Sequence, residues 1–195
     1  MRKTSLAVAL LLAVACQKPA VWMGVPGGQV VNLPEGLTVA GDPLWNRLEE
    51  HKEGVRDVWW TANGNALDLV VFFTGIRPGE VLTGAKPKEG VKAPVFKEDM
   101  QPEEIVDLFD QFISPWATSF HRGKLSPAPF LGGDGFRFEW SAVRKGDEVA
   151  LQGVGYGAVR KGRLYLVTFH APRLHYFPTL LPRVEALAKS ARLAG

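Results

Sequence analysis

Apolar residues recur at every second position in several segments of this chain, which is the spacing expected of β-strands. Residues 56–61 and 66–73 are rich in apolar and aromatic side chains and flank Asn63-Gly64, a pair typical of hairpin turns. In the later half of 66–73 both faces are apolar, as in a strand that is covered on both sides. The pattern predicts a hairpin whose second strand lies in the centre of a sheet.

Three longer segments, 135–143, 149–160 and 163–171, show the same alternation. Short turns rich in Gly and Lys separate them, so they are predicted to form three consecutive antiparallel strands. Two shorter strands are expected at 29–33 and 37–40, on either side of a turn.

A spacing of three to four residues between apolar positions predicts two helices, at 101–113 and 176–189. Pro102 suits the first helical position of the earlier one, where its missing N–H is not needed. The segments 77–98 and 116–134 show no regular period and are expected to be irregular. This order of elements predicts an α+β fold, with a single antiparallel β-sheet and helices packed on it.

Three glycines leave one face of the predicted strand 149–160 without side chains: Gly153, Gly155 and Gly157. Glycines in a strand usually mark the close approach of another group. A helix or large aromatic side chains could pack on this face, or it could be the floor of a ligand cleft. The spacing does not predict a dinucleotide site, because no helix follows to offer its N-terminus to a phosphate.

The N-terminal residues indicate export from the cytoplasm. Two basic residues precede a short apolar run, and the only cysteine, Cys16, follows Ala13-Val14-Ala15. This arrangement resembles the lipobox of bacterial lipoproteins, in which the signal peptide is cleaved before the cysteine and the thiol is acylated. Gln17 stands where an aspartate would favour the inner membrane, so the resemblance implies an outer-membrane anchor facing the periplasm.

The lipobox also divides the chain. It implies a signal peptide at 1–15, an acylated N-terminus and flexible tether at 16–28, and a single α+β domain at 29–195. Loss of Arg2 and Lys3 with the signal lowers the net charge from +3 to +1. The remaining charges are mixed in sign, so nucleic acid is not an expected partner. Without a further cysteine, the domain depends on burial for its stability.

Several short motifs resemble a group of uncharacterised proteobacterial lipoproteins: Trp60-Thr61, Gly75-Ile76, Gly135-Phe136-Arg137-Phe138-Glu139 and His175-Tyr176-Phe177. That resemblance implies no activity. The layout from the first turn, Leu33-Pro34-Glu35-Gly36, to the closing Ser190-Ala191-Arg192-Leu193 also resembles the Mog1/PsbP-like fold. Members of that fold act chiefly by docking on partners, so this second resemblance implies a sandwich architecture and a binding role.

Catalytic and metal-binding motifs are not recognisable in the sequence. No serine lies in G-x-S-x-G or S-x-x-K, and H-E-x-x-H is missing. His170 and His175 could approach each other around Pro172, but no third ligand is indicated. We therefore expect no catalytic residue, no metal site and no cofactor.

The best candidates for ligand binding are Arg173, His175 and Tyr176, which could recognise an anion at the start of the last helix. His121 and Arg122 are a second candidate pair, in a segment expected to be a loop. Ordinary polar positions are the simpler interpretation for these histidines: a strand end for His170, a helix N-terminus for His175 and a solvated loop for His121. A same-face ion pair is expected between Arg137 and Glu139.

Three functions follow from these observations. The leading one is a membrane-anchored, non-enzymatic periplasmic lipoprotein that binds an envelope protein partner or supports an assembly. The alternative is a carrier of an apolar ligand or lipid, in a pocket between the sheet and the helices. The third is an enzyme that depends on His121, His170 or His175.

Overall fold

The computed structural model describes residues 21–49, 56–83, 90 and 93–194. Cys16 and the predicted signal peptide lie outside these residues, so lipidation stays a prediction. Two sheets, two α-helices and one short 3₁₀ helix, η1 (Pro34–Gly36), account for the regular structure of the described chain. The predicted α+β class is confirmed.

The larger sheet has eight strands, and every neighbouring pair is antiparallel. In spatial order they are β1 (Trp22–Gly24), β4 (Asn46–Leu48), β5 (Asp57–Thr61), β6 (Leu69–Ile76), β10 (Arg163–Pro172), β9 (Ala150–Arg160), β8 (Gly133–Arg144) and β7 (Ala117–Phe130). The smaller sheet contains β11 (Arg192–Leu193), β3 (Leu37–Ala40) and β2 (Val30–Asn32). The helices are α1 (Pro102–Ile113) and α2 (Tyr176–Ser190).

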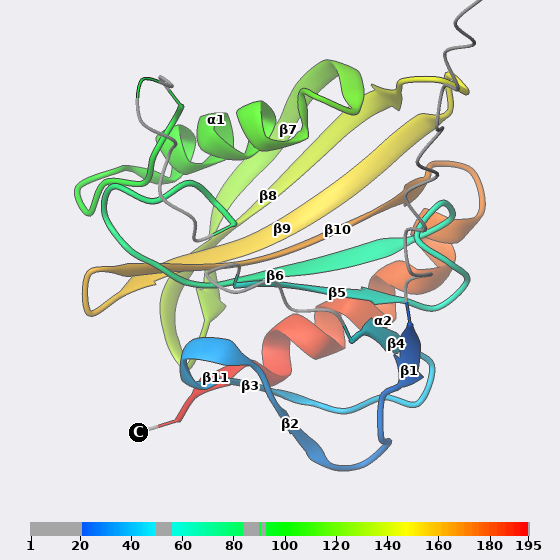
Figure 1. Cartoon of the computed structure of the whole chain (residues 1–195), viewed down its shortest axis with the longest axis horizontal. Coiled ribbons are helices and arrows are strands. Elements are labelled where there is room, and N and C mark those ends of the chain that lie inside the picture. The colour runs from blue at the N-terminus through cyan, green and yellow to red at the C-terminus, as the bar shows by residue number, and fades with distance from the viewer. Residues whose placement is uncertain (1–20, 50–55, 84–89, 91–92, 195) are drawn as a thin grey trace, which may run out of the picture.

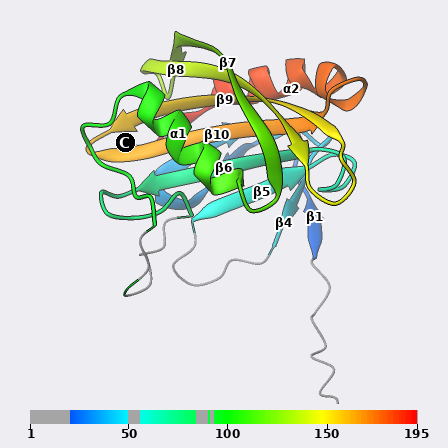
Figure 2. The ribbon, with the colours of Figure 1, turned by 90° about the horizontal axis from the view of Figure 1, so that it is seen from above.

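The elements form layers around the larger sheet. Helix α1 lies on one face, and α2 lies with the smaller sheet on the other (Figures 1 and 2). Each face therefore has its own hydrophobic core. The core under α1 contains Phe73, Phe109 and Phe138, and the core on the α2 side contains Phe72 and Phe169. Since successive residues of a strand point to opposite faces, Phe72 and Phe73 enter different cores.

The predicted hairpin is confirmed. β5 pairs with β6, and all eight residues of β6 are buried, as expected of a central strand. The connection is a loop of several residues, with Asp68 at its end. The buried Asp68 carboxylate accepts hydrogen bonds from the Thr61 hydroxyl and from the backbone N–H groups of Ala62 and Asn63. This carboxylate therefore shapes the loop around Gly64, whose φ is 101°.

The three C-terminal strands and both helices agree with the sequence pattern, but the expectation of irregular structure at 116–134 was wrong. β7 occupies residues 117–130 as an edge strand that pairs only with β8. Most of its side chains are exposed or half-buried, so no alternation of apolar residues marks it. Pro127 and Pro129 also argued against a strand, although proline is tolerated at a sheet edge.

The boundary between tether and domain also differs from the expectation. β1 lies inside the segment 16–28, and its residues pair with β4. Val25 is buried and its N–H donates to the Trp45 carbonyl over 2.8 Å. The described domain therefore includes residues that were assigned to the tether. A strand of only three residues, next to Pro26 and Gly27, leaves too short a pattern to be recognised.

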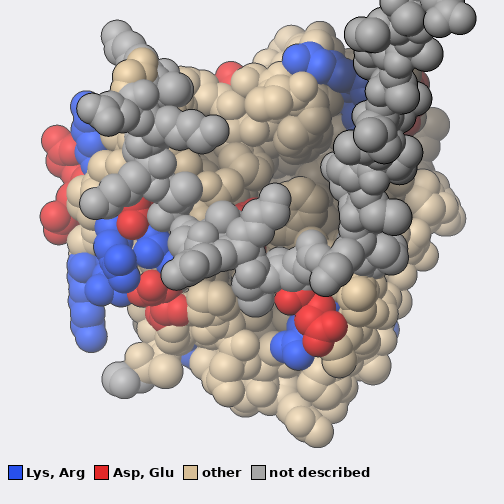
Figure 3. Space-filling view, viewed as in Figure 1, with Lys and Arg blue, Asp and Glu red and all other residues tan. Residues whose placement is uncertain are grey.

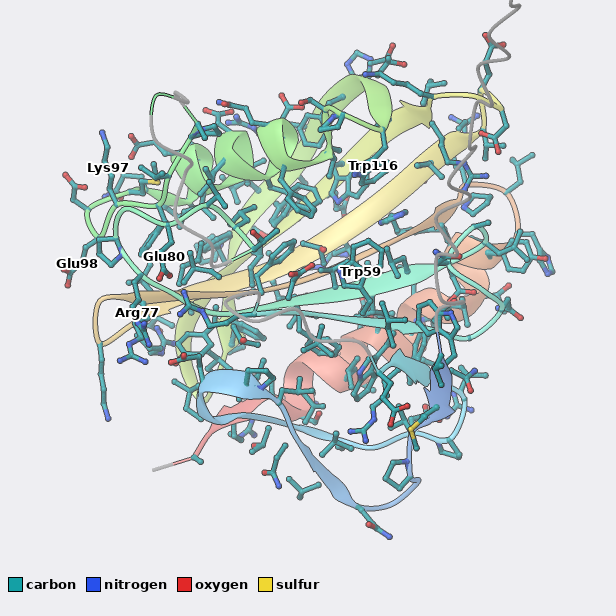
Figure 4. The ribbon with its side chains drawn as sticks, in the orientation of Figure 1. Trp59, Arg77, Glu80, Lys97, Glu98 and Trp116 are labelled. Atoms are coloured by element: carbon teal, nitrogen blue, oxygen red, sulfur yellow. The ribbon has the colours of Figure 1, made fainter. Side chains whose placement is uncertain are left out.

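The short strands predicted at 29–33 and 37–40 exist as β2 and β3, but they belong to the separate smaller sheet. Glu35, in the turn between them, connects this sheet to the larger one. Its carboxylate lies 3.2 Å from the Arg77 guanidinium and 2.5 Å from that of Arg163, and its carbonyl accepts from the Tyr165 hydroxyl. Figure 3 shows charged side chains gathered at this end of the molecule, where Figure 4 labels Arg77 and Glu80.

The glycine-lined face of β9 is covered by aromatic side chains, so it is not the floor of a cleft. The rings of Trp140, Phe138 and Phe136 on β8 lie over the three glycines. A Cβ atom at Gly155 would come within 2.2 Å of Phe138, which is closer than any real Cβ contact. Missing side chains on one strand thus make room for large ones on its neighbour.

Candidate functional site

A cavity of about 380 Å³ lies between α1 and the larger sheet. Its sheet wall comes from β5, β6 and β10, and its helix wall comes from the last turn of α1. In Figure 4, Trp59 on β5 and Trp116, just after α1, mark its two sides, and the space-filling view in the same orientation is hollowed in this region (Figure 3). This volume is within the range of small-molecule sites, which is roughly 300–1,000 Å³.

Most of the cavity wall is apolar, and much of it is aromatic. The apolar lining residues are Trp59, Leu69, Val71, Phe109, Phe112, Ile113 and Trp116. Phe112 lies edge-on to Phe73 at 5.0 Å between ring centroids, and Phe109 contacts Trp140 at 5.3 Å. Packing against these neighbours fixes the Phe109 and Phe112 rings in position, so this part of the cavity wall is held in place.

Two polar side chains point into this apolar surface from β10. Thr168 is only 1% exposed and His170 only 8%, and they lie on the same face of the strand. Trp116 stacks on the His170 ring at 5.1 Å, and Trp140 tilts against it at 5.6 Å. Among the described residues, no hydrogen bond reaches the Thr168 hydroxyl or either ring nitrogen of His170.

Arg144, at the end of β8, forms one side of the cavity rim. Its guanidinium binds both carboxylate oxygens of Asp147 and donates to the Ala66 carbonyl over 2.5 Å. These contacts tie the β8–β9 turn to the β5–β6 loop. Lys145 adds a second tie, because its backbone N–H donates to the Trp116 carbonyl over 2.9 Å. The rim is therefore held by hydrogen bonds from three separate connections.

The cavity carries no net charge at neutral pH. Burial, together with the smaller effect of the positive charge of Arg144, lowers the pKa of His170 from 6.5 to about 4. The hydrogen bonds from Arg144 hold the pKa of Asp147 below its usual value, so this carboxylate is ionised and balances the guanidinium. His170 is thus a neutral imidazole that can both donate and accept a hydrogen bond.

The sequence-predicted candidates lie elsewhere, in two separate groups. His121 and Arg122 are on β7 and not in a loop, and Arg122 forms an ion pair with Asp107 of α1. Arg173, His175 and Tyr176 are at the junction of β10 and α2. His175 occupies the N-cap position without a capping hydrogen bond from its side chain, and its ring contacts that of Tyr176 at 5.0 Å. His121 on β7 and Ala171 on β10 are three strands apart in the sheet, which is a distance of about 14 Å across the strands.

Neither group forms an enclosed site. His121, Arg122, Arg173 and His175 are all exposed. The predicted ion pair between Arg137 and Glu139 is confirmed at 2.6 Å. In the described chain, no three His, Cys, Asp or Glu side chains are grouped so that they could hold a metal ion.

The cavity itself was not located from the sequence. The sequence predicts that His170 is a polar residue at a strand end, whereas the structure buries it. One signal was available: Leu164 and Leu166 are apolar, but the next two residues on the same face of β10 are Thr168 and His170. Two polar residues that continue an apolar strand face indicate a hydrogen-bonding site in the core.

The chain matches no model of a known protein family and no curated protein sequence. Its structure is similar to the solution structure of cyanobacterial PsbP (CyanoP) from Synechocystis sp. PCC 6803, with a TM-score of 0.56, 13% identity, and coverage of 97% of this chain and 99% of that one. The fold is PsbP-like. This likeness is one of architecture, because the sequence identity is low.

Two further solved structures are more distantly similar. One is PA94 from Pseudomonas aeruginosa, with a TM-score of 0.42, 12% identity, and coverage of 82% of this chain and 92% of that one. The other is LpqN, involved in cell envelope biogenesis of Mycobacterium tuberculosis, with a TM-score of 0.36, 9% identity, and coverage of 92% of this chain and 88% of that one.

Neither helix of the described chain is long and apolar enough to span a bilayer.

Proposed function

We propose that this protein is a non-enzymatic, lipid-anchored protein of the bacterial cell envelope that holds an apolar ligand in the cavity between α1 and the sheet. The cavity carries this proposal: about 380 Å³ of space with walls of tryptophan, phenylalanine and aliphatic side chains. Such a lining gains free energy when it is removed from water, at about 25 cal/mol for each Å² of apolar surface. Of the functions that the sequence predicts, ligand carriage has the most specific structural support.

Envelope anchoring and the outer-membrane location rest on the lipobox at Cys16. An acylated Cys16 would attach the domain to the membrane through its lipid chains alone. An envelope protein partner stays a prediction of the sequence, and it is compatible with carriage because a carried ligand must be received and delivered. We propose no catalytic role for His170: its neighbours in the cavity include no nucleophile activated by it.

Ligand binding is tested with N-phenyl-1-naphthylamine, an uncharged probe whose fluorescence rises in apolar sites. The wild-type protein should bind it saturably, with one equivalent per chain. Ala66 is exposed at the cavity rim, so Ala66→Trp should obstruct entry without disturbing the core. Val30→Trp is the matched control, because Val30 is 70% exposed on the smaller sheet, on the opposite side of the larger sheet.

Binding that is weakened at least several-fold by Ala66→Trp and is unchanged by Val30→Trp supports the proposal. Absence of saturable binding, or equal binding by the two variants, contradicts it. Anchoring is tested separately with Cys16→Ser in a bacterial host that acylates lipoproteins. The variant should move from the membrane fraction to the soluble fraction, and its retention in the membrane would contradict a lipid anchor at Cys16.

A further inference from the structure

We propose that the cavity selects an uncharged amphiphile, whose apolar chain lies among the aromatic side chains and whose hydroxyl, ester or amide group is bound by Thr168 and His170. This inference rests on the proposed function and adds the chemical class of the ligand. It depends on the two unpartnered polar side chains of β10 and on the charge balance at the rim.

Thr168 and His170 are the polar side chains of β10 that line the cavity. Both side chains are more than nine-tenths buried and both line the cavity, yet no described residue satisfies their hydrogen-bonding atoms. Buried polar groups are hydrogen-bonded in most proteins, because an unsatisfied one costs free energy on folding. A ligand group that donates to or accepts from both would supply the missing partner.

Thr168 and His170 are polar but uncharged at neutral pH. A hydroxyl and a neutral imidazole can each donate and accept, but neither offers a full charge to a ligand. His170 is neutral at neutral pH because burial lowers its pKa to about 4. An ionised head group placed beside these two residues would lose its water and gain no opposite charge.

Arg144 is the only cationic group that lines the cavity in the described chain. Its Nε and Nη2 atoms donate to the Asp147 carboxylate, and its Nη1 atom donates to the Ala66 carbonyl. An anionic head group would have to displace Asp147, which would leave that carboxylate without its partner. The positive charge of Arg144 is therefore already balanced by Asp147, so the rim does not favour the binding of a charged ligand.

The shape of the cavity agrees with a ligand that has one polar end. Trp59 and Trp116 face each other across the space, and Leu69 and Val71 form its floor on β6. These side chains can bury an alkyl chain or a ring system. The polar part of the lining consists of Thr168 and His170 on β10, together with Asn65, Arg144 and Asp147. A sugar or nucleotide, which needs many polar partners, fits this lining poorly.

The test compares 1-decanol, decanoate and decyltrimethylammonium, which share one chain length and differ in head-group charge. Binding to the folded protein at neutral pH is followed by calorimetry and by the fluorescence of the cavity tryptophans. We expect 1-decanol to bind at least about tenfold more tightly than either ion, because a charge is costly to bury without a partner.

Two variants test the hydrogen bonds. Thr168→Val keeps the shape of the side chain and removes its hydroxyl, and His170→Phe keeps an aromatic ring. Each should weaken the binding of 1-decanol about two- to tenfold. Each should also reduce the ratio of the affinity for 1-decanol to the affinity for decanoate. Thr118→Val is the matched control on the exposed part of β7 and should leave binding unchanged. Circular dichroism and the urea midpoint establish that each variant is folded.

The outcomes separate the two proposals. Binding of decanoate that equals or exceeds that of 1-decanol would overturn the selection for uncharged ligands and would assign the head group to Arg144, while ligand carriage would stand. Equal binding of 1-decanol by the wild type and by both folded variants would overturn the role of Thr168 and His170. Failure of all three probes, together with N-phenyl-1-naphthylamine, would overturn the proposed function itself.

Discussion

At the scale of single residues, two buried polar side chains of this protein differ in their hydrogen bonding. Asp68 is 1% exposed, and its carboxylate accepts hydrogen bonds from Thr61, Ala62 and Asn63. His170 is 8% exposed and has no such partners in the described chain. The first side chain is thus structural, whereas the second is available to a ligand. Each makes a distinct prediction.

Asp68→Ala should lower the free energy of unfolding by about 2–4 kcal/mol, because it leaves several buried or half-buried donors of the β5–β6 loop without an acceptor. Asp68→Asn keeps one carbonyl oxygen and should cost less. The measurement is the urea midpoint at neutral pH. Asp147→Ala is the matched control on an exposed turn and should change the midpoint little. Equal losses from Asp68→Ala and Asp147→Ala would argue against the organising role of Asp68.

His170 should make the protein less stable in acid. Its pKa is lowered from 6.5 to about 4 by folding, so between these two values the unfolded chain binds more protons than the native one. Stability therefore falls as the pH drops through this window, by up to about 3 kcal/mol from this residue. Arg144 and Asp147 are the charged groups that line the same cavity, and the hydrogen bonds from Arg144 hold the pKa of Asp147 below its usual value.

The measurement is the difference between the wild type and His170→Phe in urea unfolding across that window, since subtraction removes the contribution of the carboxylates. The wild type should lose stability more steeply than the variant as the pH falls. Parallel curves for the two proteins would mean that His170 is not buried in its neutral form.

At the scale of elements, β8 and β9 form a matched pair in which large side chains on one strand require glycine on the other. Gly155→Ala would place its Cβ atom 2.2 Å from the Phe138 ring, which is fully buried. We expect a loss of about 1–3 kcal/mol, measured by urea unfolding, because a filled core resists an added methyl group. Gly24→Ala on β1 is the control, since nothing lies within 4 Å of its position.

A second substitution distinguishes this clash from a loss of backbone freedom. Phe138→Leu removes the ring that the new methyl group meets, so Gly155→Ala should cost less in the Phe138→Leu background than in the wild type. Additive losses in the double variant would show that the two residues act independently. That result would contradict the packing account of the glycine-lined face.

The elements also show what the sequence could and could not predict. β6, α1 and the β8–β10 meander were predicted correctly because they are buried on one or both faces, and burial imposes a regular spacing on apolar residues. β7 was missed because an exposed edge strand needs no such spacing. The cavity was missed for another reason: its residues come from β5, β6, β10, α1 and two connections, and only the fold brings them together.

At the scale of the whole molecule, the position of β1 bears on how the domain would be held. The sequence predicts an anchor at Cys16, and the structure places Trp22 in the sheet beside Leu48. Six residues of extended chain span at most about 20 Å, so an acylated Cys16 would keep the β1–β4 edge close to the membrane surface. β5, which carries Trp59 at the cavity, is the next strand in the sheet. This arrangement would shorten the path between a lipid bilayer and the cavity.

The last prediction tests whether the domain begins at β1 or at residue 29, where the sequence analysis placed it. A chain that starts at Val21 keeps β1 and should unfold at the same urea concentration as one that starts at Cys16. A chain that starts at Gln29 loses β1 and the buried Val25, and it uncovers Trp45, which is 1% exposed. It should be less stable by at least about 2 kcal/mol, since burial of one such aliphatic side chain contributes roughly this amount. Equal urea midpoints for the chains that start at Val21 and Gln29 would mean that residues 21–28 belong to the tether and do not stabilise the domain.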